Sequence, residues 1–343
     1  MDVTRILSQN VVLKNSFDEC MTCLQDVSRI FKDIIKTPPG TPEEFRVTGA
    51  GFPSELFAAR RNIFSTLFHS SYILLDIPLE HRLLYGKINY LFRVWVTAAD
   101  NLLDQEDKMT VKVHMPTDSR VMRQVVSIMA ADRVLTHIIR EAFLKGGFTP
   151  QDGRVLIDGT LEVLLPSAAE EAAEEKGIVR RPKPGYVLKT IHRLKTQLLF
   201  QVPLLGPERV EKHIDERKLA LCREGLGKFG LGCQILDDIR DIRRDHVQKR
   251  HNYILSVMAH ENRDALKVLE KMSSGLDVAA SVFSKFPDVT APAARLAAQE
   301  LAEGLHLLDT CGLGVDAKTA RAVARYMFKA LDVEKALAYV DRP

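Results

Sequence analysis

The chain has 343 residues, of which 46% are hydrophobic and 27% are charged, as in an ordinary globular protein with a large core. A formal net charge of +3 is too small to favour a nucleic-acid groove or an anionic membrane surface. Five scattered cysteines, an odd number, argue against a disulfide framework and indicate reduced thiols.

The amino-terminal segment Met1 to Gln9 contains one arginine and no sustained apolar run, so we expect neither a secretory signal nor a membrane span there. Charged residues interrupt the other apolar stretches well before the roughly 20 residues that a span needs. The sequence therefore predicts a soluble, cytoplasmic protein.

Helical spacing of apolar residues dominates the chain. Residues 1–52 are expected to form an amino-terminal helix and a linker. From Tyr85 to Asp104 the apolar side chains recur at steps of three and four, which is typical of a helix with one buried face. No comparable run of strict alternation indicates a strand. Similar patterns predict further helices at about 54–76, 119–145, 151–174, 185–202, 208–242, 263–284, 292–310 and 316–339.

Most prolines lie between these helical segments, where a missing N–H breaks no interior hydrogen bond. Only Thr37–Thr48 and Arg180–Gly185 look like substantial linkers, and neither marks a shift in composition. We therefore predict one all-α domain over 1–343, a large helical bundle. The glutamate-rich segment Ala168–Lys176 is interpreted as a solvated helix face rather than a cation site.

Two acidic motifs follow strongly apolar helices. Asp100 and Asp104 are four residues apart, which places them on one helix face about 6 Å apart along the axis. Asp237, Asp238 and Asp241 form the second motif. Like charges on one face repel, and acids near a helix carboxyl end oppose its dipole. Magnesium would offset both costs, since it takes oxygen ligands and bridges carboxylates to substrate phosphates.

Basic residues accompany both motifs. Arg93 lies two helical turns before Asp100 within an apolar stripe, and a buried arginine needs a partner or an anion. Lys195 interrupts another apolar stripe in the same way, although either side chain could instead extend to the surface. The candidate anion-binding residues are Arg60, Arg61, Arg93, Lys195 with Thr196, Arg243, Arg244, Lys249 and Arg250.

Between about Arg60 and Tyr253 these features resemble the polyprenyl synthetase family of the class I isoprenoid synthases. Asp100 to Asp104 is similar to the family's first DDxxD motif, with Asn101 in place of the second aspartate. Gly232 to Asp241 is similar to the second motif and keeps Gln234. Lys195-Thr196 resembles the family's Lys-Thr pair, and Ala130-Ala131-Asp132 resembles a signature of the intervening helix.

The resemblance implies a helical bundle around a central apolar cavity and a homodimer. It implies that Lys195, Lys249 or Arg250 hold the diphosphate of an allylic substrate, and that Trp95 closes the floor of the elongation cavity. The implied magnesium ligands are Asp100, Asp104, Asp237, Asp238 and Asp241.

The departures from the family pattern lie on the side of the second substrate, isopentenyl diphosphate. The family's GGKR segment reads Ala58-Ala59-Arg60-Arg61, Arg93 replaces a histidine or glutamine, and an arginine pair after the first motif is missing. The favoured hypothesis is magnesium-dependent ionisation of an allylic prenyl diphosphate and transfer of the prenyl cation to isopentenyl diphosphate. The alternatives are a terpene synthase that cyclises a single prenyl diphosphate, a non-catalytic subunit of a heteromeric synthase, and a head-to-head synthase.

Overall fold

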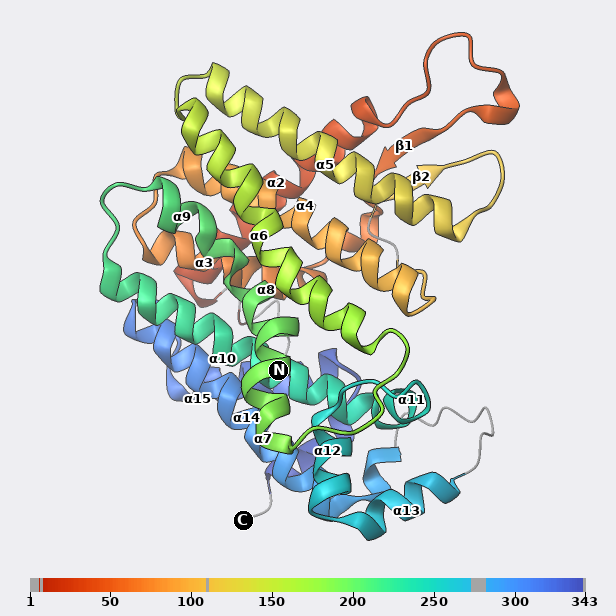
Figure 1. The fold of residues 1–343 in the computed structure, drawn as a ribbon. Helices are drawn as coiled ribbons and strands as arrows, with labels where there is room; N and C mark the ends of the chain where they lie inside the picture. Colours follow the sequence, from red (N-terminus) through yellow and green to blue (C-terminus); the bar gives the residue numbers. More distant parts are fainter. Residues whose placement is uncertain (1–5, 7–8, 109–110, 273–281, 342–343) are drawn as a thin grey trace. The chain divides into compact units, whose positions relative to one another are not determined.

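The structure is a computed structural model that describes residue 6 and residues 9–108, 111–272 and 282–341. Helices make up most of the described chain, which confirms the all-α prediction (Figure 1). The chain divides into two compact units. The amino-terminal unit consists of Leu7–Leu161 and Pro203–Asp215, and the carboxy-terminal unit consists of Met1–Ile6, Glu162–Val202 and Glu216–Pro343.

Long amphipathic helices build the amino-terminal unit. α2 begins after Asn10, whose side chain accepts a hydrogen bond from the Leu13 N–H and so satisfies one free donor of the first turn. Its buried residues recur at helical spacing and face α3, α4 and β1. The helices of this unit are α2 (Val11–Ile34), α3 (Ile63–Leu74), α4 (Leu79–Leu103), α5 (Arg120–Leu144), the first half of α6 (Pro150–Glu174) and α9 (Leu205–Val210).

Short elements join these helices. The strands β1 (Thr48–Gly51) and β2 (Lys112–His114) pair antiparallel, with Gly49 opposite Val113. Strands this short carry too little alternation to be recognised in the sequence. The short 3₁₀ turns are Glu43–Phe45, Ser54–Phe57 and Ala59–Arg61.

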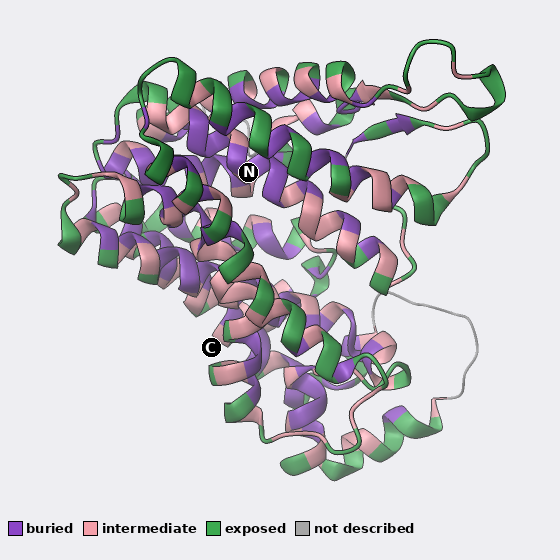
Figure 2. Ribbon diagram, turned by 45° about the horizontal axis from the view of Figure 1, so that its top comes forward, coloured by how far each residue is buried: buried purple, intermediate pink, exposed green. Residues whose placement is uncertain are grey.

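The carboxy-terminal unit is built on α10 (Glu216–Arg240) and α14 (Pro287–Thr310), which pack along each other. The two backbones approach closely at Gly225 and Gly304, where a Cβ on Gly304 would come within 2.6 Å of the Gly225 carbonyl oxygen. Both helices have many buried residues, and Figure 2 shows buried residues of the chain in purple.

Further helical segments complete this unit. They are α7 (Pro184–Tyr186), the π-helical turns Val187–Ile191 and Arg193–Gln197, α8 (Leu198–Gln201), α11 (Ile242–Val247), α12 (Tyr253–His260), α13 (Arg263–Lys271), the 3₁₀ turn Val282–Lys285, α15 (Ala317–Ala330), the 3₁₀ turn Glu334–Ala336 and α16 (Leu337–Val340). The 3₁₀ turn Val202–Leu204 begins with the last residue of one stretch of this unit, and its other two residues belong to the amino-terminal unit.

The helix predicted at 208–242 is two helices, α9 and α10, separated by 211–215. The helix predicted at 263–284 is α13 followed by residues that partly lie outside the described chain. Among the described residues, no helix combines the length and apolar character that crossing a membrane requires.

Candidate functional site

The second acidic motif lies at the junction of α10 and α11. α10 ends at Arg240 and α11 begins at Ile242, so Asp241 falls between the two helices while Asp237 and Asp238 occupy the last turn of α10. The Asp238 side chain is 2% exposed, whereas the Asp237 side chain keeps 35% of its surface accessible. One motif therefore presents carboxylates in two different environments.

Asp238 is held by a dense set of hydrogen bonds. Its carboxylate accepts from the Tyr253 backbone N–H at 2.5 Å and from the Gln234 side-chain amide at 3.0 Å, and its Oδ2 lies 2.9 Å from His192 Nε2. The Asn252 side chain donates to the Asp238 carbonyl at 2.8 Å. Both carboxylate oxygens of Asp238 therefore have partners within the carboxy-terminal unit.

Asp237 and Asp241 contact arginines of their own motif. The Arg240 guanidinium donates to Asp237 and, at 2.7 and 3.1 Å, to the two Asp241 oxygens, and Arg244 donates to Asp241 Oδ2 at 2.8 Å. Sequence reasoning missed Arg240, although its spacing of three residues from Asp237 could have revealed the pair. Burial, with repulsion from neighbouring aspartates, raises the pKa of Asp237 to about 6, while Arg240 lowers it in part.

The Lys-Thr pair lies in the π-helical turn Arg193–Gln197, where the Leu198 N–H bonds to the Arg193 carbonyl five residues earlier. Such turns are rare and recur at functional sites. Thr196 Oγ1 donates to Gln234 Oε1, and Gln234 in turn donates to Asp238. The structure thus joins the predicted residues Thr196 and Gln234 to the second acidic motif through direct hydrogen bonds.

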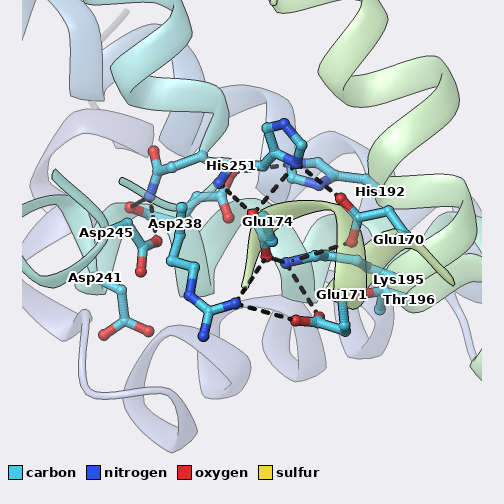
Figure 3. Close-up of polar contacts among 12 residues, drawn as sticks. Glu170, Glu171, Glu174, His192, Lys195, Thr196, Asp238, Asp241, Asp245 and His251 are labelled. Atoms are coloured by element: carbon cyan, nitrogen blue, oxygen red, sulfur yellow. Dashed lines mark hydrogen bonds and ion pairs between the residues drawn. The ribbon is translucent and has the colours of Figure 1, made fainter. Parts of the chain in front are cut away.

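The interpretation of Ala168–Lys176 as a solvated face is wrong for two of its acids. The side chains of Glu170 and Glu174 are 5% and 1% exposed, and they point at Lys195 and at His251 in the loop between α11 and α12 (Figure 3). Lys195 Nζ lies 3.1 Å from Glu171 Oε1 and 3.5 Å from Glu170 Oε2, and it also contacts Glu174. These glutamates are therefore paired with cationic groups and not solvated. Their partners lie 21 or more residues away in the chain.

Two of the other predicted basic residues, Lys249 and Arg250, lie in the same loop. Arg250 Nη1 is 3.7 Å from both Glu171 and Glu174, and its side chain is 15% exposed. Lys249 is exposed and has a φ of 56°, a left-handed backbone conformation uncommon for a residue with a side chain. Arg243 and Arg244 belong to α11, where Arg244 contacts Asp241 and Asp245.

The first acidic motif closes α4 in the amino-terminal unit. Asp100 is exposed in the last turn, and Asp104 is the residue at which the helix ends. Asn101 between them is 1% exposed, and its side chain donates to the Lys108 carbonyl at 2.7 Å and accepts from the Lys108 N–H at 2.9 Å. Asn101 therefore ties down the loop after α4, a role that its side-chain amide performs and a carboxylate could not.

Of the three arginines expected near the second substrate, Arg93 and Arg61 are in direct contact. Arg93 Nη1 donates to the Arg61 carbonyl at 3.0 Å, and Arg60 and Arg61 are exposed in the preceding turn. Burial and the nearby Arg61 charge lower the pKa of Arg93. Among the described residues, none of these three arginines forms an ion pair, so positive charge gathers here without a carboxylate.

Trp95 packs in the amino-terminal unit between α4 and α5. Its indole N–H donates to the Ile128 carbonyl at 3.0 Å, and its ring meets Phe92 edge to face with centroids 6.1 Å apart. The indole thus has the hydrogen-bond partner that a half-buried tryptophan needs. These contacts anchor Trp95 to α5.

The donor set of the second motif fits a hard divalent cation. Asp237 and Asp241 offer carboxylate oxygens, the ligands that Mg²⁺ prefers. The raised pKa of Asp237 reflects burial and repulsion among the aspartates, which a bound cation would relieve. A cation at these oxygens would also replace the contacts that Arg240 now makes with both residues.

Comparison with known proteins identifies the fold. No family profile and no curated protein sequence matches the chain. Geranylgeranyl pyrophosphate synthase from Lactobacillus brevis has a TM-score of 0.61 and 14% identity, covering 91% of this chain and 96% of its own. Decaprenyl diphosphate synthase from Rhodobacter capsulatus has a TM-score of 0.61 and 12% identity, covering 93% and 98%. Heptaprenyl diphosphate synthase from Staphylococcus aureus has a TM-score of 0.60 and 13% identity, covering 93% and 98%. The chain has the fold of these synthases over nearly its whole length.

Proposed function

We propose that this chain, which has the fold of the polyprenyl diphosphate synthases, is a magnesium-dependent isoprenoid synthase. It ionises an allylic prenyl diphosphate and transfers the prenyl cation to isopentenyl diphosphate. Shared fold at 12–14% identity does not determine chemistry, so the proposal depends on the residues of the site.

One observation carries the proposal. Thr196, Gln234 and Asp238 form a continuous hydrogen-bonded chain, although Thr196 and Gln234 are 38 positions apart. Lys195 precedes Thr196, and Asp237 and Asp241 flank Asp238, so cations and carboxylates of the predicted site share one neighbourhood. This combination is what binding of a metal diphosphate requires.

The residues of the site have distinct proposed roles. Lys195 and Arg250 hold the departing diphosphate and stabilise its growing negative charge. Asp238, fixed by His192 and the Tyr253 N–H, keeps Gln234 and Thr196 in place. Asp237 and Asp241 are the proposed Mg²⁺ ligands of the second motif, and Asp100 and Asp104 those of the first motif. Mg²⁺, when bound, would add charge stabilisation to the leaving group.

The identity of the acceptor depends on the other arginines. Arg60, Arg61 and Arg93 gather positive charge without an ion-pair partner among the described residues, which supports binding of a second diphosphate and hence prenyl transfer. The missing arginine pair after the first motif supports the alternative, in which the substrate's own double bonds attack the cation and the enzyme cyclises a single prenyl diphosphate.

Product analysis separates these two functions. The purified chain is incubated with Mg²⁺ and geranyl, farnesyl or geranylgeranyl diphosphate, with and without isopentenyl diphosphate. Prenyl transfer gives a longer prenyl diphosphate only when both substrates are present. Cyclisation gives a hydrocarbon or an alcohol from the allylic substrate alone.

A substitution of Arg93 tests whether this residue binds isopentenyl diphosphate. Arg93→Gln should raise the KM for isopentenyl diphosphate by at least about tenfold, the effect of losing one charge-assisted contact, and leave the KM for the allylic substrate unchanged. An equal effect on both substrates would argue against this assignment. Failure of the purified chain to turn over any of the allylic substrates would favour the non-catalytic subunit.

A further inference from the structure

The carboxylate of Glu174 lies among groups that are suited to binding a phosphate. Its Oε1 contacts Lys195 Nζ and lies 3.7 Å from Arg250 Nη1. Its Oε2 accepts from the His251 backbone N–H at 2.5 Å and lies 3.2 Å from His251 Nδ1. An ammonium, a guanidinium, a backbone N–H and an imidazole converge on one anion in this cradle (Figure 3).

The anion in this cradle comes from the protein itself. Glu174 ends α6 and its side chain is 1% exposed, while Glu170 and Glu171 also pair with Lys195. Burial opposes the charge of Lys195, yet the three glutamates hold the pKa of its ammonium well above the ordinary value. Lys195 is therefore a firmly charged group whose charge is already neutralised.

The cradle is held by backbone contacts that do not involve Glu174. The Ile178 N–H donates to the Lys249 carbonyl at 2.9 Å, and the Arg250 N–H donates to the Asp245 carbonyl at 2.9 Å. Arg181 donates to the Arg250 carbonyl at 2.9 Å. The loop that presents His251 is thus fixed from both sides without the Glu174 side chain, and the His251 N–H loses its printed acceptor when that side chain moves.

A metal ion is the less favoured occupant. Ligand atoms of Glu170, Glu174 and His251 lie within 4.8 Å of one another. Lys195 already supplies a cation to the two glutamates, however, and a divalent ion at that point would face its ammonium.

We propose that Glu174 is an internal competitor of the substrate diphosphate, an inference that rests on the proposed function. Its carboxylate occupies the positions that phosphate oxygens would take at Lys195, Arg250 and His251. Diphosphate binds only when Glu174 leaves the cradle, so the glutamate weakens apparent affinity and opposes binding of less highly charged anions.

Binding of inorganic pyrophosphate without divalent cations tests the proposal by titration calorimetry. Glu174→Gln removes the charge but keeps the size of the side chain, and it should lower the Kd by about tenfold if the vacated cradle is populated about one time in ten. The matched control is Glu175→Gln, which makes the same charge change on the adjacent exposed residue and should leave the Kd unchanged. In turnover, Glu174→Gln should lower the KM for the allylic substrate with little change in kcat.

Different results would overturn the competitor role of Glu174 and the assignment of Lys195 to the diphosphate. Unchanged or weaker pyrophosphate binding by Glu174→Gln would mean that Glu174 positions Lys195, and it would overturn the competitor role while leaving the proposed function intact. If Lys195→Met bound pyrophosphate as tightly as the parent chain, the assignment of Lys195 to the diphosphate would fail instead. Should Glu174→Gln not fold, Glu174→Asp retains the charge on a shorter side chain and should bind pyrophosphate more tightly than the parent; equal or weaker binding would overturn the competitor role.

Discussion

The side chain of Asn101 holds the backbone of the following loop at a motif position where the family has an aspartate. It replaces an aspartate of the motif that this segment resembles, and its amide bonds to both the N–H and the carbonyl of Lys108. An aspartate could accept from the N–H but would turn a carboxylate oxygen toward the carbonyl. The Asn101 side chain, in the last turn of α4, thus fixes the loop that follows this helix.

Asn101→Asp should destabilise the protein by about 2–3 kcal/mol, the cost of a buried polar group facing an unsuitable partner. Urea denaturation at pH 7 measures the change, with Asn101→Ser as a smaller neutral control. Unchanged stability together with increased turnover would indicate that position 101 faces the metal after all.

Glu19 forms a network that links three helices of the amino-terminal unit. Its carboxylate accepts from Arg82 at 2.6 and 2.8 Å and lies 2.6 Å from His69 Nε2. Burial alone would raise the pKa of Glu19, but the hydrogen bonds from Arg82 and His69 outweigh it and lower the pKa to about 2. Because the folded pKa is below the ordinary 4.5, the network stabilises the fold above pH 4.5 and loses this contribution as the pH falls toward 2.

Glu19→Gln should therefore lower the free energy of unfolding by about 3 kcal/mol at pH 7, as expected when one partner of a buried ion pair is removed. The difference from the parent should shrink between pH 4.5 and pH 2. Denaturant titrations across this pH range measure it. A difference that stays constant down to pH 2 would rule out the ionised carboxylate as its source.

Residue types and spacing predicted most of the candidate site but not the partners of its charges. The aspartates and Lys195 follow from local patterns, whereas Thr196 and Gln234 follow from the resemblance to the family's motifs. Glu170 and Glu174 could not be recognised as buried, because their burial comes from Lys195 and His251, which are distant in the sequence. A local run of acidic residues therefore reads as solvent-exposed when the basic residues that pair with it are distant in the sequence.

At the scale of elements, the crossing of α10 and α14 is set by glycine. Gly304→Ala should destabilise the protein by about 2–3 kcal/mol, because its Cβ would come within 2.6 Å of the Gly225 carbonyl oxygen and 2.8 Å of the Phe229 nitrogen. Gly185→Ala is the control, since no atom lies within 4 Å of the Cβ that it adds. Thermal unfolding compares the two variants. Equal melting temperatures would show that the helices do not approach this closely.

Helix periodicity predicted the long elements well and the irregular ones poorly. α4, α5 and α6 begin and end within a few residues of the predicted bounds except at the start of α4. The π-helical turns around Lys195 are invisible to a 3.6-residue pattern, and α12 is too short to give a clear stripe. The break between α9 and α10 interrupts a pattern that would otherwise read as one helix.

At the scale of the whole molecule, the fold is that of enzymes with which the chain shares 12–14% identity. Buried helix faces can be preserved by many apolar sequences, whereas ligand positions require particular residue types. The fold was therefore predictable from periodicity and motif order together. The expected single domain and homodimer stay predictions, because they concern arrangements beyond the two compact units.

The central proposal is a magnesium-dependent ionisation that requires the aspartates of each motif. The most direct measurement is release of inorganic diphosphate from geranyl diphosphate and isopentenyl diphosphate by the purified chain, with Mg²⁺ or with chelator. We predict Mg²⁺-dependent release that falls at least about hundredfold in both Asp100→Ala and Asp237→Ala, as for loss of a metal ligand. It should be unchanged in Asp264→Ala, where the lost acid is an exposed residue of α13. Retention of the parent's turnover by both motif variants would contradict the account.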